Sequence, residues 1–298
     1  IPYLPDDQQS AAETMAELME SASSYAFYSS FLLLLSSNPA IIWTLINMLQ
    51  VFYYLVFINV KYPYNAETFF KIFSIANFDF IPNPFEHISL INDELPAPTK
   101  FLENETNGLY LSNAGSMLMF GLLALLGYGA LVLSLKWCTF MPAPIRKYTT
   151  NLKNDFEWSG MIRTWITSYL DLNLAAALQI NALRFDTISH VVSSFLAILT
   201  IIVNAALPIV IFNFIRKKRF SAKAISEKYS SLISEFRTNS KVCMMFYVII
   251  LIKRFFFSTI LVFLHDYPYY EILGIIIIHI FPVILLIGKS PYESTTDK

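Results

Sequence analysis

The residues most able to do chemistry in this chain are two cations and one carboxylate within long apolar segments. Lys253 and Arg254 lie near the middle of the apolar stretch 242–264, and Asp171 interrupts another such stretch. A cation at mid-membrane depth costs about 2.5 to 3.5 kcal/mol, so something must compensate it. We predict an ion pair between Asp171 and Arg254, which serves as structural glue or as part of an ion or substrate path. The alternative is that one cation snorkels toward the headgroups.

Other polar side chains in apolar segments are candidates for a polar interior. Asn47 and Gln50 lie about one turn apart, which suits bonds to neighbouring helices and not contact with lipid. Asn204 and Pro208 indicate a kink with local repair of the backbone. His279 has no string of titratable partners at helical spacing, so we assign it a hydrogen-bonded structural role and not a proton relay.

The sequence contains no catalytic signature. It has no glycine-rich phosphate loop, no HExxH, no CxxC and no nucleophile elbow. We therefore predict that the protein is not an enzyme, and we expect no cofactor, no metal and no nucleic-acid partner. The two cysteines, Cys138 and Cys243, are too few for a disulfide framework and are interpreted as free thiols.

Membrane helices must position these residues. Hydrophobic residues make up 55% of the chain and charged ones only 14%, against roughly 25% charged in soluble domains. Segment 187–215 contains no Asp, Glu, Lys or Arg, and a helix of that length more than covers a hydrocarbon core of about 30 Å. The basic cluster Arg216, Lys217, Lys218 and Arg219 follows at once, which places this end on the cytoplasmic side.

The charge pattern around this segment predicts an all-α fold, a polytopic helical membrane bundle with about seven transmembrane helices. The first span is short and serine-rich, and it either stops at the break before Pro39 or continues as one kinked helix. Segment 158–183 carries Arg163 and Asp171, so it forms either half of a hairpin with the next span or an interfacial helix with a re-entrant turn. The expected spans are 18–36, 41–60, 116–137, 158–183, 187–215, 242–264 and 271–287.

The predicted organisation has three parts, with the amino end outside and the carboxyl end inside. The chain begins at Ile1 without Met and without a signal-peptide pattern, which indicates a processed product or part of something longer. The parts are a polar lead-in at 1–20, a transmembrane domain at 21–288 and a cytoplasmic tail at 289–298.

Two polar loops interrupt the transmembrane domain. An acidic, proline-rich extracellular loop at 61–112 carries the sequon Asn104-Glu105-Thr106, whose glycosylation requires exposure on the outside. The cytoplasmic loop at 216–241 contains an expected amphipathic helix at 221–238. Together with the basic cluster, this loop favours anionic lipids of the inner leaflet.

Several short motifs along the chain are informative together. They are Trp43-Thr-Leu-Ile-Asn47-Met-Leu-Gln50, Tyr62-Pro63, Ala76-Asn77-Phe78-Asp79-Phe80-Ile81-Pro82-Asn83, Gly160-Met-Ile-Arg163, Ser168-Tyr169-Leu170-Asp171, Lys228-Tyr229 and Lys253-Arg254. These motifs resemble the carboxyl-terminal membrane module of very large ciliate surface proteins, which has a loose likeness to TRP-like multi-span proteins. The resemblance covers nearly the whole chain, and it implies a large extracellular amino-terminal region anchored by seven or more helices in the plasma or ciliary membrane.

Two functions from different classes are compatible with these features. The first is a structural membrane anchor that holds an extracellular or surface assembly, with extracellular protein partners or an attached ectodomain. The alternative is a TRP-like ion channel or transporter subunit whose polar interior is lined by Asp171, Arg254, Asn204 and His279. The connection 265–270 is too short to build a re-entrant selectivity loop, which favours the anchor.

Overall fold

The computed structural model describes residues 39–77, 81–85, 95–137, 140, 142–157, 161–217 and 245–289. Every regular element among them is a helix, which confirms the all-α prediction for this part of the chain. The chain divides into two compact units, Ile1–Phe80 and Ile81–Lys298. The lead-in at 1–20, the expected span at 18–36, the amphipathic helix at 221–238 and the tail after Lys289 lie outside the described residues.

The first unit contains the apolar segment that we expected to form one span at 41–60. Helix α2 (Pro39–Tyr54) is shorter than that, because it passes into the 3-10 helix η1 (Leu55–Phe57), after which Ile58 is extended. The Tyr62 hydroxyl donates to the Leu55 carbonyl oxygen over 2.8 Å, so a side chain helps to satisfy the helix end. At 16 residues, α2 is about 24 Å long, which is less than a hydrocarbon core of about 30 Å.

Part of the predicted extracellular loop is helical in this unit. Helix α3 (Tyr64–Lys71) starts directly after Pro63 and runs into the 3-10 helix η2 (Ile72–Asn77). Lys71 and Glu67 form an ion pair of 3.0 Å on the exposed side of α3. The connection that we expected as a polar loop therefore begins with ordered helices.

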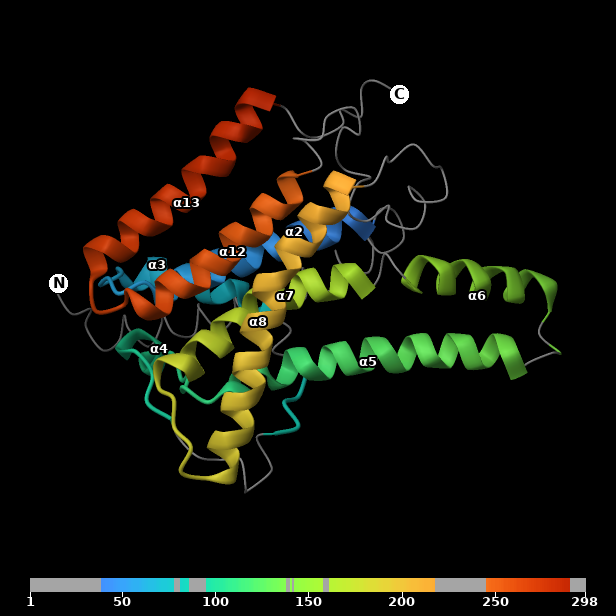
Figure 1. Cartoon of the computed structure of the whole chain (residues 1–298), viewed down its shortest axis with the longest axis horizontal. Coiled ribbons are helices and arrows are strands. Elements are labelled where there is room, and N and C mark those ends of the chain that lie inside the picture. The colour runs from blue at the N-terminus through green and yellow to red at the C-terminus, as the bar shows by residue number, and fades with distance from the viewer. Residues whose placement is uncertain are drawn as a thin grey trace, which may run out of the picture. The chain divides into compact units, whose positions relative to one another are not determined.

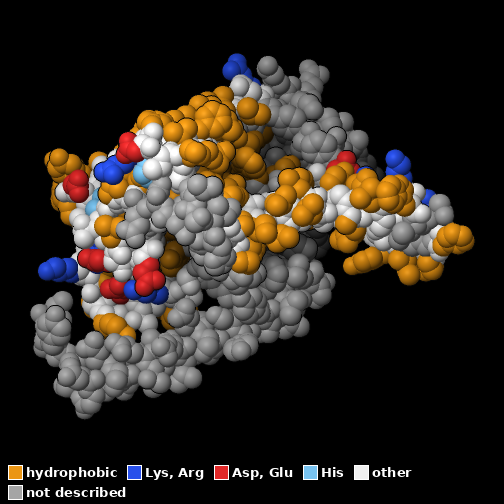
Figure 2. All heavy atoms as spheres, turned by 90° about the horizontal axis from the view of Figure 1, so that it is seen from below, with side chains coloured by type: hydrophobic (Ala, Val, Ile, Leu, Met, Phe, Trp, Pro, Cys, Tyr) orange, Lys and Arg blue, Asp and Glu red, His pale blue; other side chains and the backbone are white. Residues whose placement is uncertain are grey.

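Among its described residues, the second unit contains three helices that are long and apolar enough to cross a membrane, which indicates a membrane protein. Figure 2 shows broad areas of hydrophobic side chains on the visible surface, with the charged side chains gathered in separate groups. The three are α5 (Tyr110–Trp137), α8 (Ile188–Lys217) and α13 (Pro268–Lys289).

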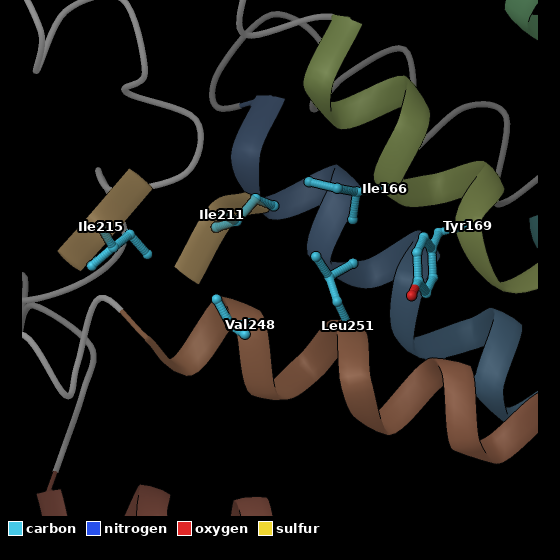
Figure 3. Close-up of a cluster of buried hydrophobic side chains, with 6 residues drawn as sticks. All are labelled: Ile166, Tyr169, Ile211, Ile215, Val248 and Leu251. Atoms are coloured by element: carbon cyan, nitrogen blue, oxygen red, sulfur yellow. The ribbon is translucent and has the colours of Figure 1, made fainter. Parts of the chain in front are cut away.

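Helix α7 (Met161–Asn181) is the centre of the second unit. It contacts α5, α8 and α12 (Phe246–Phe263), and every side chain from Ile166 to Gln179 is buried. Figure 3 shows one of these contacts, where side chains from three helices turn toward a common space; they are Ile166, Tyr169, Ile211, Ile215, Val248 and Leu251. Because its neighbours cover it, α7 can carry polar residues that a lipid-facing helix could not.

Three connections meet at one end of the second unit (Figure 1). The backbone N–H of Lys100 in α4 (Thr99–Glu103) lies 3.4 Å from His265 Nε2 in the turn between α12 and α13. The backbone N–H of Tyr110 donates to Gln179 Oε1 over 2.8 Å, which joins the start of α5 to the end of α7. The connection from α7 to α8 lies here too, because Gln179 also donates to Ser194 Oγ of α8, which in turn donates to the Arg184 carbonyl oxygen.

At the other end of α5, helix α6 (Ala143–Asp155) turns back along it. Pro142 caps α6 with extended backbone, and the rings of Tyr128 and Phe156 stack with centroids 6.5 Å apart. Lys153 and Glu157 pair at 2.7 Å, so two charges near this contact neutralise each other. Figure 1 shows α5 and α6 side by side.

Candidate functional site

The candidate site is a set of buried polar side chains around α7, which we call the polar seam. It consists of six residues of α7, with Asn204 of α8 and Arg254 of α12. Within the described part of the chain, no group of three or more His, Cys, Asp or Glu side chains is placed to hold a metal ion. The six residues of α7 are Thr164, Thr167, Ser168, Asp171, Asn173 and Gln179.

The predicted partners Asp171 of α7 and Arg254 of α12 are both buried, and these two helices contact each other. Their side chains are 6% and 3% exposed. Arg254 Nη1 donates to the Ile166 carbonyl oxygen over 2.8 Å, which ties α12 to α7 five residues before Asp171. Lys253, the other cation of the pair of basic residues, is partly buried. A direct bond between the Asp171 carboxylate and the Arg254 guanidinium stays a prediction.

Asn204 is fixed to α7 by two hydrogen bonds, and the reason for one of them lies in Pro208. Proline has no N–H, so Pro208 cannot donate to the carbonyl oxygen four residues earlier, which belongs to Asn204. The Tyr169 hydroxyl of α7 donates to that oxygen over 2.9 Å. Asn204 Nδ2 donates to Asn173 Oδ1 over 3.1 Å. A neighbouring helix thus repairs the backbone bond that is missing inside α8.

This repair predicts that substitutions of Tyr169 and Pro208 have coupled effects on the free energy of unfolding. Tyr169→Phe should lower the free energy of unfolding by about 1 to 3 kcal/mol, because it leaves a buried acceptor without a donor. In a Pro208→Ala background the new backbone N–H can reach the Asn204 oxygen, so the same change should cost about 1 kcal/mol less. Unfolding by denaturing detergent in mixed micelles measures all four proteins.

Tyr110→Phe provides a matched control for this cycle. Its hydroxyl also bonds to α8, at 2.8 Å from Thr200 Oγ1, but that contact does not involve the carbonyl group that Pro208 leaves free. The cost of Tyr110→Phe should therefore be the same with and without Pro208→Ala. Equal costs of Tyr169→Phe in both backgrounds would show that the hydroxyl does not repair the helix.

Gln179 joins three helices, and we did not identify it from the sequence. Its Oε1 accepts from the Tyr110 backbone N–H of α5, and its Nε2 donates to Ser194 Oγ of α8 over 3.1 Å. The signal that could have pointed to it is a glutamine at the end of an apolar run that begins at Leu174. Its two partners lie 69 and 15 residues away in the chain, so only the packing of the helices reveals them.

His279 of α13 makes local contacts in the structure. Its Nδ1 lies 2.8 Å from the Ile275 carbonyl oxygen, and its ring meets the Phe257 ring of α12 edge-on at 5.7 Å. It does not share a described hydrogen bond with the residues of the polar seam. These contacts fit the hydrogen-bonded structural role that we assigned to it.

The remaining predicted residues are not members of the polar seam. Asn47 and Gln50 lie in the first unit on α2, where Gln50 is fully buried. Asn104 Nδ2, the atom that would carry a glycan, donates to the Lys100 carbonyl oxygen at the end of α4. Arg216 is exposed in the last turn of α8, which ends at Lys217, and the other two residues of the basic cluster, Lys218 and Arg219, lie outside the described part of the chain.

The surroundings of His265 predict that stability depends on pH at the end where the three connections meet. Burial lowers the pKa of His265, Asp266 and Glu103 raise it, and Lys100 lowers it. A histidine whose pKa is lower when folded binds protons preferentially when unfolded. Stability should therefore be constant above the ordinary histidine pKa of about 6.5 and should fall as the pH drops below it.

Hydrogen exchange of the α4 amides between pH 7.5 and 5 measures this effect. His265→Gln keeps an acceptor for the Lys100 N–H but does not titrate, so it should remove the part of the pH dependence that belongs to this group. An identical pH profile in the two proteins would rule out His265 as its origin.

No protein-family model, curated protein or solved structure matches this sequence. The assignment of a function therefore depends on the geometry of the chain itself, and the resemblance to ciliate surface proteins stays an expectation.

Proposed function

We propose that the protein is a multi-pass membrane anchor that holds an extracellular or surface assembly. The observation that supports this function is that polar side chains in the polar seam, and Tyr169 beside it, bond from one helix to another. Such bonds hold helices in fixed positions, whereas a conduction path needs polar groups that face water. The bonds are those from Arg254 to Ile166, from Tyr169 to Asn204, from Asn204 to Asn173 and between Gln179 and both Tyr110 and Ser194.

The anchor has about seven spans in this proposal, with the amino end outside and the carboxyl end inside the plasma or ciliary membrane. Helices α7 and α12 cross the membrane within the bundle, where their polar residues face other helices and not lipid. With seven spans and the amino end outside, the loop 61–112 and the connections 181–186 and 265–270 all lie outside. The meeting of these three connections at one end therefore supports this topology. The basic cluster at the opposite end of α8 contacts anionic lipid.

Outside the membrane, the proposed partner surface includes helix α3. Its aromatic residues Tyr64 and Phe69 are 41% and 52% exposed, although aromatic side chains of this size usually gain stability from burial. Exposed aromatic residues are also typical anchors of protein interfaces. In the proposal, α3 contacts an attached ectodomain or an extracellular protein.

Photo-crosslinking in intact cells tests the anchor. A crosslinking amino acid at position 69 should form a specific adduct with a protein or with a preceding part of the same polypeptide. The control is position 126 of α5, where Leu126 is 59% exposed in a candidate span and lipid should be the only neighbour. Protein adducts that are equal at both positions, or absent at position 69, would contradict the proposal.

One observation favours the alternative of a TRP-like channel or transporter subunit. Ser189, His190 and Ser193 of α8 are buried, and their side-chain polar atoms have no hydrogen-bond partner among the described residues. Buried polar groups without partners are expected to meet water or an ion. Ion-flux recordings from proteoliposomes decide between the two functions. The anchor function predicts no flux above that of protein-free liposomes. A flux that Asp171→Asn changes would contradict the anchor and support the channel or transporter.

A further inference from the structure

An apolar groove runs between α8 and α12 beside the core cluster, with which it shares Val248. It encloses about 350 Å³, which is within the range of small-molecule sites. Its walls include Ala205, Pro208 and Phe212 of α8 and Val248, Ile252 and Phe256 of α12. We propose that this groove binds one acyl chain of an anionic phospholipid, whose headgroup lies at Arg216.

The position of the groove along α8 matches one leaflet of a bilayer. Ala205 and Arg216 are eleven residues apart in the same helix, which corresponds to about 16 Å along its axis. Half of a hydrocarbon core is about 15 Å. An acyl chain that starts at the depth of Arg216 therefore reaches the far end of the groove at the middle of the membrane.

The surroundings of the groove define the class of its occupant. Ile209 of α8 and Ile252 and Phe256 of α12 are 61%, 41% and 50% exposed beside it, and α8 is a candidate span. The solvent that meets these side chains in a membrane is hydrocarbon. The occupant of an apolar groove in that solvent is a lipid chain, which fills the space and restores the dispersion contacts that a void would lose.

The charge at the end of α8 selects the headgroup. Apolar packing alone distinguishes poorly between lipids, because every lipid tail offers the same chemistry to the groove. Arg216 is exposed one turn beyond Phe212, and the basic cluster continues after it in the sequence. A basic residue near the surface contributes about 1 kcal/mol toward an anionic lipid, which corresponds to about a fivefold preference.

Native mass spectrometry of the full chain in detergent tests the site with two probes, phosphatidylglycerol and phosphatidylcholine with identical acyl chains. The first bound lipid should be phosphatidylglycerol, with about a fivefold preference that falls toward onefold in Arg216→Gln. Ala205→Phe fills the groove and should reduce the first binding step of both lipids at least fivefold.

Ala206→Phe is the matched control, because Ala206 is exposed on α8 but does not line the groove. It should bind both lipids as the unmodified chain does. Equal binding of phosphatidylglycerol by the Ala205 and Ala206 variants would show that the basic cluster alone attracts the lipid, which overturns the groove site. Failure of the groove to bind either lipid overturns it as well. The assay involves no extracellular partner, so its outcome is independent of the proposed anchor.

Discussion

Replacing Arg254 with Met is expected to lower the free energy of unfolding by about 3 to 5 kcal/mol, the largest effect that we predict for a single residue. Arg254 is 3% exposed and donates to the Ile166 carbonyl oxygen of α7 over 2.8 Å. In the proposed pairing, its loss also leaves the buried Asp171 carboxylate without compensation. Removal of one partner from a buried ion pair costs more than the pair contributes, because the other charge remains buried.

A double-mutant cycle with Asp171→Asn tests that pairing directly. If the carboxylate and the guanidinium compensate each other, Arg254→Met should cost at least about 1.5 kcal/mol less when Asp171→Asn is already present. Lys253→Met is the control on the same helix, and it should cost less than about 1 kcal/mol because Lys253 is only partly buried. Strictly additive effects of the Arg254 and Asp171 substitutions would show that the two groups are not paired.

The outer helices of the second unit could be predicted from the sequence because the apolar character of their own side chains is enough to identify them. The charge-free segment before Arg216 became α8, and the apolar segments near Trp137 and His279 became α5 and α13. In these helices the apolar side chains face outward over long stretches. Average hydropathy measures this property directly, so the sequence was sufficient.

Helix α7 was harder to interpret because its surroundings are supplied by other helices. Its polar side chains would exclude it from lipid, but α5, α8 and α12 cover it. Hydropathy cannot distinguish such a helix from one at the membrane surface, which is why a hairpin and an interfacial helix both remained open. The structure shows that α7 and α8 pack side by side, which sequence composition does not encode.

The individual bonds of the polar seam were mostly beyond prediction from the sequence. Asn204 and Pro208 indicated a repaired kink, but the donor that repairs it, Tyr169, lies 35 residues earlier in the chain. In a periodic apolar pattern Tyr169 counts as one more core residue. Its hydroxyl acquires a specific partner only when α7 and α8 pack, so the choice among many possible donors is made by tertiary structure.

Gly115→Ala is expected to be the second most damaging change, with a loss of about 2 to 4 kcal/mol in the free energy of unfolding. A Cβ atom at this position of α5 would overlap the side-chain amide of Asn83. That amide donates to the carbonyl oxygens of Leu111 and Ser112 over 3.2 and 2.6 Å, and its Oδ1 accepts from the Phe85 backbone N–H. The methyl group must therefore displace an amide that holds the segment around Asn83 against the start of α5.

Gly121→Ala is the matched control on the same helix, since among the described residues no heavy atom lies within 4 Å of where its Cβ would stand. It should be neutral or stabilising by up to about 1 kcal/mol, because alanine is the better helix former. Thermal unfolding of both variants in the same detergent separates the two cases. If the two substitutions have equal effects, Asn83 does not pack on Gly115. Gly115→Ala should cost less free energy of unfolding when Asn83→Gly is already present, because the amide that the methyl group would displace is then absent. Such coupling would show that the contact between residues 83 and 115 positions the amino end of α5.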